Sequence, residues 1–306
     1  MKPLPILLTA LLLLAGCASA PRLTPWQAVP LLATLPPDCD PGVAAPGAAP
    51  VIPGGLAVVR SDGRDVVLVA VRGCLMTADA GTGASDLLPT YGDAIAPTMV
   101  DGTSAGLAFS SSLSGSVRAI DRTGAITFNA SGLRHPLGVR LLPGGSLLVA
   151  EAATGRVLHL GPDEDARPRL VAEGLDRPCG LLLVDATQAI VTESGGGRLT
   201  RIRLDRYERQ QIAGGLEQPQ GIARMADGRL AVVEAGRQRL VAIDATSGRI
   251  EVLADRLPVV AGGAGSAPDP HAVADVAAAP DGTLFVSGNA TRTVLKVTPR
   301  PRPATR

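Results

Sequence analysis

The chain has 306 residues, 46 % of them hydrophobic and only 2 % aromatic, with a formal net charge of +1. A near-neutral chain does not carry the basic surface of a nucleic-acid-binding protein, so this class of partner is excluded. The scarcity of aromatic side chains disfavours a carbohydrate or quaternary-amine site, because such ligands stack on aromatic faces.

Residues 1–16 have the composition of a bacterial export signal, with Lys2 followed by an apolar run that is too short to span a bilayer. The run ends in Leu14-Ala15-Gly16-Cys17, which resembles a bacterial lipoprotein signal. The resemblance implies cleavage before Cys17, acylation of this cysteine and attachment to a membrane. Ala18 stands where inner-membrane retention would favour an Asp, so the resemblance implies the outer membrane. We expect the protein to face the periplasm, although the sequence does not decide the side.

Residues 17–53 comprise the lipidated N-terminus, an apolar segment and a Pro/Gly-rich linker that has too few large apolar side chains to pack. An exported protein can form disulfides. The pairing we favour joins Cys39 in the linker to Cys74 in the first repeat, which leaves Cys179 as a free thiol. Other pairings remain open.

From residue 54 to residue 298 the chain repeats a unit of about 41 residues. The second apolar strands of the six copies begin at 67, 107, 147, 189, 230 and 283. Turn signals such as Asp62-Gly63 and Asp101-Gly102 are interpreted as hairpins between the first and second strands. A repeat of this length with strand-only patterning predicts an all-β, six-bladed β-propeller of four-stranded antiparallel blades.

The last repeat supplies only three strands before the tail at 299–306, for which we expect disorder. The apolar segment from Trp26 to Leu35 has no other place in the pattern. We therefore expect this N-terminal strand to pair with the last blade and close the ring, which removes exposed strand edges.

Three repeats open with Pro-x-Gly, at 136–138, 178–180 and 219–221, and their second strands end in an acidic residue. This pattern resembles the six-bladed propellers of the NHL-repeat and SMP-30/gluconolactonase group over residues 51–298. In the lactonases of that group, metal-binding Asn and Asp occupy the positions of Leu137, Cys179 and Gln220. The chain departs from that pattern, which argues against metal-dependent lactonase chemistry.

Glu151, Glu193 and Glu234 end the second strands of three successive repeats, where the other copies have Val71, Ser111 and Ser287. The three carboxylates could hold a divalent cation such as Ca²⁺ or Mg²⁺, or one could act as a general base. Their strand endings also resemble those of streptogramin B lyase propellers, where carboxylates bind magnesium and a His assists elimination. The alternative, favoured by the repetition itself, is that each Glu pairs with a following arginine: Arg156, Arg198 or Arg239.

His135 and His271 are acid/base candidates, because both lie in loops expected on the same face as the carboxylates. Residues expected to face a ligand there are Arg134, Arg177, Cys179, Gln220 and His271. For Cys179 the alternative is a small apolar filler equivalent to Leu137.

The sequence thus predicts a membrane-anchored periplasmic lipoprotein propeller that acts as a binding platform for an unknown protein or small-molecule ligand. It assigns no cofactor and no confident catalytic residue. The alternative is an SMP-30/gluconolactonase-like hydrolase or a streptogramin-lyase-like metal-dependent enzyme.

Overall fold

The computed structural model describes residues 26–33, 35, 52–71, 73–88, 97–162, 167–260 and 273–300. Cys17, Cys39, His271 and the tail after residue 300 lie outside the described residues. Among the helices of the described part, none is long and apolar enough to cross a membrane.

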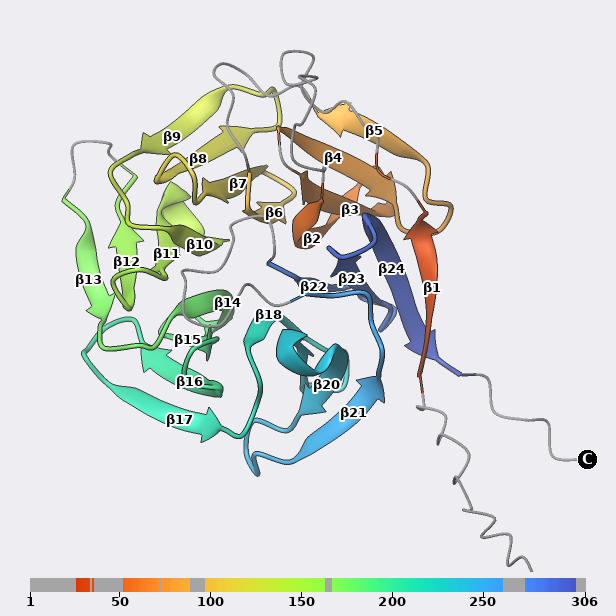
Figure 1. Cartoon of the computed structure of the whole chain (residues 1–306). Helices are drawn as coiled ribbons and strands as arrows, with labels where there is room; N and C mark the ends of the chain where they lie inside the picture. The colour runs from red at the N-terminus through yellow and green to blue at the C-terminus, as the bar shows by residue number, and fades with distance from the viewer. Residues whose placement is uncertain are drawn as a thin grey trace, which may run out of the picture.

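Six four-stranded antiparallel sheets surround a central axis, as the sequence predicts (Figure 1). Blades 1 to 3 contain β2 Pro53–Ser61, β3 Arg64–Val71, β4 Cys74–Asp79, β5 Ser85–Leu88, β6 Met99–Thr103, β7 Gly106–Ser111, β8 Ser116–Asp121, β9 Ile126–Ala130, β10 Pro136–Leu141, β11 Leu147–Glu151, β12 Arg156–Leu160 and β13 Arg169–Ala172. Blades 4 to 6 contain β14 Pro178–Asp185, β15 Gln188–Glu193, β16 Arg198–Arg203, β17 Arg209–Ala213, β18 Pro219–Arg224, β19 Leu230–Glu234, β20 Arg239–Ile243, β21 Ile250–Ala254, β22 Val276–Ala278, β23 Leu284–Gly288, β24 Thr293–Pro299 and β1 Trp26–Leu32.

The first strand of each repeat lies nearest the axis, where it contacts the first strands of the neighbouring blades (Figure 1). We call the face where the chain enters these strands the upper face, and the face with the hairpins to the second strands the lower face. Buried apolar side chains form six clusters, one between each pair of adjacent blades. Each blade is therefore stabilised mainly by its neighbours, and the ring must close for every cluster to be covered.

The N-terminal strand β1 closes the ring, which confirms the prediction from the sequence. It pairs antiparallel with β24, with Trp26 opposite Pro299 and Leu32 opposite Val294. Figure 1 shows β1 as the outermost strand of blade 6, beside the last strand of the chain.

One hairpin differs from the prediction. Asp62 and Gly63 form a tight turn with positive φ angles of 49° and 78°, as expected of a hairpin of this kind. Asp101 and Gly102, in contrast, lie inside β6, paired with Ala108 and Leu107. Gly102 is therefore a packing glycine, because a Cβ atom there would come within 2.5 Å of Leu68 Cδ1.

Candidate functional site

The three glutamates on the upper face lie at equivalent places, each at the end of the second strand of its blade. All three are buried, with exposed fractions of 4 % for Glu151, 1 % for Glu193 and 0 % for Glu234. The register of blade 6 places Gly288 at this position, because Gly288 pairs with Thr293 as Glu193 pairs with Arg198. The assignment of Ser287 from the sequence was wrong by one residue.

Each of these carboxylates holds the loop that leads into the first strand of its own blade. The backbone amides of Arg134, Asp176 and Glu217 donate to Glu151, Glu193 and Glu234 over 2.7, 2.7 and 2.8 Å. This contact joins two loops of one blade, so each carboxylate has a structural role. We call it the rim clamp.

In blade 4 the rim clamp is completed by an arginine. Arg198 donates from Nε to Glu193 Oε1 over 2.9 Å and from Nη2 to Oε2 over 2.6 Å, and the Thr200 hydroxyl donates to Oε1. Burial raises the pKa of Glu193, but the hydrogen bonds from Arg198, Asp176 and Thr200 outweigh it and hold the pKa below its usual value. A carboxylate held in its charged form in this way is poorly suited to act as a general base.

Blade 5 repeats the arrangement with two arginines. Arg239 donates from Nε to Glu234 Oε2, and Arg237 donates from Nη1 to Oε1 over 2.6 Å. Arg237 also lies 3.3 Å from a carboxylate oxygen of Glu217. The expected pairing of each glutamate with a following arginine is thus found in blades 4 and 5.

Blade 3 departs from this pairing. Glu151 Oε2 accepts from the Thr154 hydroxyl over 2.8 Å, whereas Arg156 is exposed and makes no side-chain contact of this kind with the described residues. In blade 4 the residue at the place of Thr154 is Gly196, and a Cβ atom there would lie 3.0 Å from the Arg198 guanidinium carbon. In blade 4, Gly196 leaves space for the Arg198 side chain. In blade 3, the Thr154 side chain occupies this space and donates the hydrogen bond to Glu151.

The structure does not bring the three glutamates together. Each serves its own blade, and within the described ranges no group of three or more His, Cys, Asp and Glu side chains is placed to hold a metal ion. Glu151, Glu193 and Glu234 therefore do not form the shared cation site considered from the sequence.

His135 lies in the loop before β10, on the upper face, and its carbonyl accepts from Ala152 N over 3.1 Å. It has a φ of 57°, and Arg177 and Gln218, which precede the prolines of blades 4 and 5, share this left-handed conformation. His135 thus belongs to a backbone turn built into three blades. His271 lies outside the described residues, and its acid/base role stays a prediction.

The positions nearest the axis are filled by buried side chains. Leu137 and Cys179 belong to one apolar cluster with exposed fractions of 0 % and 1 %. Burial, together with the charge of Asp275, raises the pKa of the Cys179 thiol, which is free. The interpretation of Cys179 as an apolar filler is confirmed, and its assignment to a ligand-facing surface is not supported.

Gln220 is also buried, and its side-chain oxygen accepts from Ala274 N over 2.6 Å. It holds the chain as it enters blade 6, so it does not present its side-chain oxygen to a ligand. Arg134 is exposed on the upper face and Arg177 is partly exposed there. Of the described residues expected to face a ligand, these two arginines remain accessible.

Sequence reasoning missed Asp275, a fully buried carboxylate just before the innermost strand of blade 6. It occupies the place of the repeat glycines Gly180 and Gly221, and its side chain fills the space a Cβ atom of Gly221 would take. Leu56 N donates to Oδ2 over 2.9 Å and Val276 N donates to Oδ1 over 2.8 Å. The residue thus joins the last blade to the first. An Asp in place of the repeat glycine was the signal that could have revealed it.

Burial raises the pKa of Asp275 to about 6. The charge of Arg140 and the hydrogen bonds from the Leu56 and Val276 amides lower this pKa, and the charge of Asp101 raises it. Arg140 Nη1 lies 3.8 Å from Asp101 Oδ1. Asp275, Arg140 and Asp101 break the repeat symmetry. The position of Asp275 is glycine or methionine in the other blades, and the shared position of Arg140 and Asp101 is alanine or leucine in the remaining four blades.

Cys74 is disulfide-bonded, and its partner lies outside the described residues. The pairing with Cys39 therefore stays a prediction.

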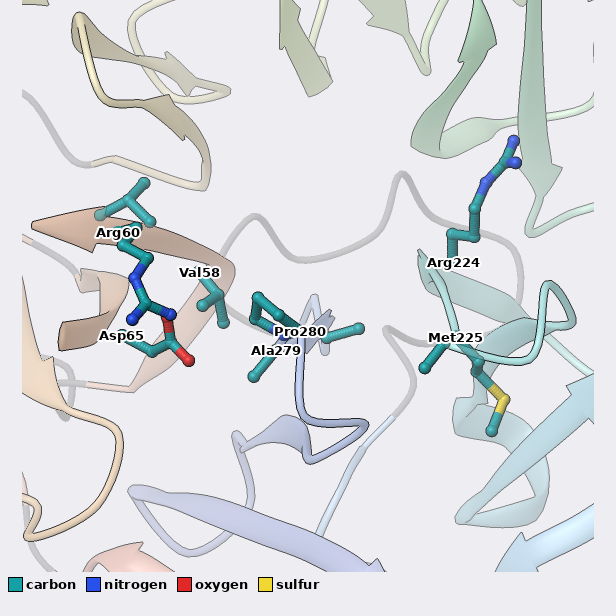
Figure 2. A pocket seen from close by; sticks show the side chains of 10 residues that line it. Val58, Arg60, Asp65, Arg224, Met225, Ala279 and Pro280 are labelled. Atoms are coloured by element: carbon teal, nitrogen blue, oxygen red, sulfur yellow. The ribbon is translucent and has the colours of Figure 1, made fainter. Parts of the chain in front are cut away.

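A cavity of about 270 Å³ opens at the lower end of the axis between blades 1, 5 and 6. Figure 2 shows Arg60 and Asp65 on one side of it, Arg224 and Met225 on the other, and Pro280 between them. Arg60 Nη1 lies 3.3 Å from Asp65 Oδ1, so part of the charge at this opening is already paired.

The sequence matches no protein-family model and no curated protein. Solved structures do match. A streptogramin B lyase has a TM-score of 0.61 at 12 % identity, over 90 % of this chain and 98 % of that chain. A catalytically inactive virginiamycin B lyase from Staphylococcus aureus with quinupristin has a TM-score of 0.58 at 14 % identity, over 89 % of this chain and 99 % of that one.

A nidogen/laminin complex also matches, with a TM-score of 0.54 at 14 % identity over 66 % of this chain and 79 % of that chain. At such identities the likeness shows the propeller fold alone. An enzyme and a protein of a protein–protein complex share it, so the fold does not decide between catalysis and binding.

Proposed function

We propose that the chain is an outer-membrane lipoprotein whose periplasmic propeller is a non-catalytic binding platform for a protein or small-molecule ligand. The observation that carries the proposal is the state of the three upper-face glutamates. Each is buried and bonded within its own blade, so the repeated acidic residues serve the scaffold. A function must then lie in residues that break the repeat.

The proposed anchor would hold the propeller close to the membrane. Residues 18–25 separate Cys17 from Trp26, the first residue of β1. A fully extended chain of this length spans about 30 Å. Substitution Cys17→Ala should abolish labelling by a radioactive fatty acid and release the protein from membranes, and unchanged labelling would refute the anchor.

The alternative is an SMP-30/gluconolactonase-like hydrolase or a streptogramin-lyase-like enzyme that uses the glutamates with His135 or His271. Its support is that the carboxylates and His135 share the upper face. Metal analysis of the purified protein separates the two proposals, together with a screen of lactones, esters and streptogramin B antibiotics. We expect no stoichiometric divalent ion and no turnover. A bound ion whose removal by chelator ends a measured turnover would overturn the platform.

A further inference from the structure

Blades 1 and 2 are packed less fully at their lower ends than blades 3 and 4. Their shared cluster contains seven buried apolar residues among those described, the fewest of the six clusters. Between blades 3 and 4, the lower end is filled by Leu142 and Leu183, which pack against the buried cluster. The equivalent residues between blades 1 and 2 are Val59 and Gly102, so this place holds one valine side chain, with Leu68 packed against Gly102, instead of two leucine side chains.

A groove of about 700 Å³ lies in this place. The volume is within the range of about 300–1,000 Å³ that is usual for ligand sites. The groove runs from Val59 and Arg60, which also line the axial cavity of Figure 2, outward to Leu88 and Ile120. The groove thus leads from the axis to the outer strands on the lower face.

Apolar side chains form the base of the groove, which we call its floor, and polar side chains line its two edges, which we call its banks. Leu68 and Leu107 are buried below it, and Val59, Leu88 and Ile120 are partly exposed. Hydroxyl groups stand along the banks at Ser61, Thr77, Thr103, Ser104 and Thr123. Within the described part of the chain the Thr77 hydroxyl makes only a long hydrogen bond of 3.4 Å, to Asp86 O, which leaves it able to bind a ligand. The Thr103 hydroxyl accepts from Ala105 N over 3.1 Å, and its contact with Gly106 O is long, at 3.5 Å.

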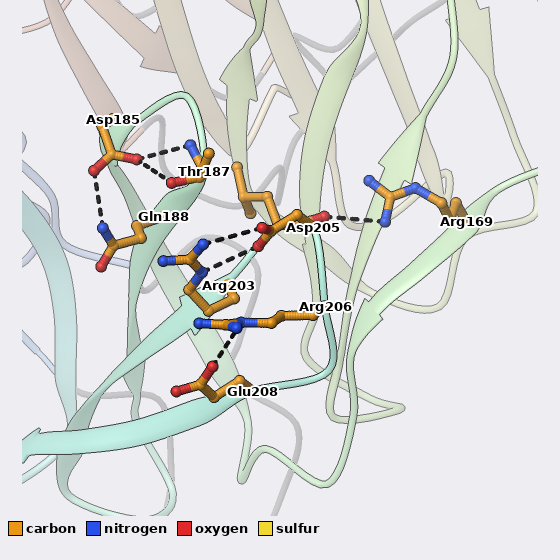
Figure 3. Close-up of polar contacts among 9 residues, drawn as sticks. Arg169, Asp185, Thr187, Gln188, Arg203, Asp205, Arg206 and Glu208 are labelled. Atoms are coloured by element: carbon orange, nitrogen blue, oxygen red, sulfur yellow. Dashed lines mark hydrogen bonds and ion pairs between the residues drawn. The ribbon is translucent and has the colours of Figure 1, made fainter.

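The two banks carry opposite charges. Asp62 lies on the blade 1 side and Arg122 on the blade 2 side, and neither makes a side-chain hydrogen bond or ion pair with another described residue. The lower turn of blade 4 is different, because Arg203 pairs with Asp205 and Arg206 with Glu208 (Figure 3).

We propose that this groove binds a short extended peptide segment with alternating apolar and polar side chains. The proposal rests on the proposed binding platform and names its site and ligand class. The apolar floor takes alternate side chains of the segment, the hydroxyls bond its backbone amides and carbonyls, and Asp62 and Arg122 fix its direction. A hydrocarbon chain would leave the hydroxyls and charges of the banks unbonded. A sugar would find no aromatic face among the lining residues.

The test uses fluorescein-labelled, blocked hexapeptides that alternate Val, Leu, Ile or Phe with polar residues, and it measures fluorescence anisotropy with the purified protein. Two variants narrow the groove from its two sides: Ser61→Trp in blade 1 and Ser104→Trp in blade 2, both at exposed positions of the lining. The matched control is Ala186→Trp, at an exposed position of the corresponding hairpin of blade 4. Circular dichroism confirms that each variant is folded.

We expect hexapeptides with the alternating pattern to bind, and both groove variants to weaken binding roughly tenfold or more, whereas Ala186→Trp leaves it unchanged. Binding of dodecanoate in place of every peptide, or no peptide binding at millimolar concentration, would overturn the proposal. Unchanged peptide binding in both folded groove variants would overturn the groove while leaving the platform in place. Turnover in the substrate screen would instead overturn the platform.

Discussion

Glu193 at the upper rim and Asp275 at the axis are both buried carboxylates, yet their surroundings shift their pKa values in opposite directions. Glu193 receives hydrogen bonds from an arginine, a threonine and a backbone amide, and its pKa is lowered. Asp275 receives two backbone amides and no guanidinium, and burial raises its pKa to about 6. The rim clamp therefore stabilises the charged form of Glu193, whereas burial at the axis destabilises the charged form of Asp275.

The largest expected effect is at the rim. Glu193→Gln removes the negative charge that Arg198 and the Asp176 amide hold, and we expect the free energy of unfolding to fall by about 3 kcal/mol. Urea denaturation at pH 7 measures it. The control is Glu208→Gln, which breaks the exposed ion pair with Arg206 and should change the free energy of unfolding very little. An equal loss in both variants would contradict the structural role of the clamp.

The axial carboxylate gives a smaller effect with a characteristic pH dependence. The pKa of Asp275 is higher in the folded chain than its usual value of 3.8, so the folded state gains stability as the pH falls through about 6. Between pH 7.5 and pH 4.5 this gain is about 2 kcal/mol. Asp275→Asn should remove it.

Denaturation of wild type and Asp275→Asn at both pH values measures the difference. The lowered pKa of Glu193 acts in the opposite sense, because its contribution is lost as the pH falls below the usual value of 4.5. A wild-type stability that changes with pH by the same amount as that of the variant would show that Asp275 is not the group that titrates.

The smallest expected effect comes from giving blade 3 the glycine that blade 4 has at the equivalent turn position. Thr154→Gly removes the hydroxyl that bonds Glu151 and gives Arg156 the space that Arg198 has beside Gly196. We expect the new ion pair to offset most of the lost hydrogen bond, with a net change below about 1 kcal/mol. Adding Arg156→Gln to this variant should then destabilise it, whereas Arg156→Gln alone should not. If Arg156→Gln had the same effect in the wild type and in Thr154→Gly, Arg156 would not be the residue that replaces Thr154 as the partner of Glu151.

Much of the fold could be predicted from the sequence, because strand alternation and the repeat length report on packing that every blade shares. The closing strand at Trp26–Leu32 followed from counting strands. It could not be predicted that Glu151 bonds Thr154 and not Arg156, since this choice depends on the space beside a single turn residue. Asp275 was missed because the last repeat lacks Pro-x-Gly, and its degenerate sequence also displaced the assignment of Ser287 by one residue. Gly102 was assigned to a turn because Asp-Gly usually marks one, and its packing role needs the neighbouring blade to be in place.

The closing strand also has a consequence for the order in which the chain can fold. β1 is among the first segments to be synthesised, but its partner β24 is the last strand of the chain. Until β24 arrives, the edge that β1 offers has no partner. Pairing across nearly the whole sequence is slow. The protein therefore has a late, single closing step during which its strand edges are exposed, and we expect this step to be the one most vulnerable to aggregation and most dependent on chaperones.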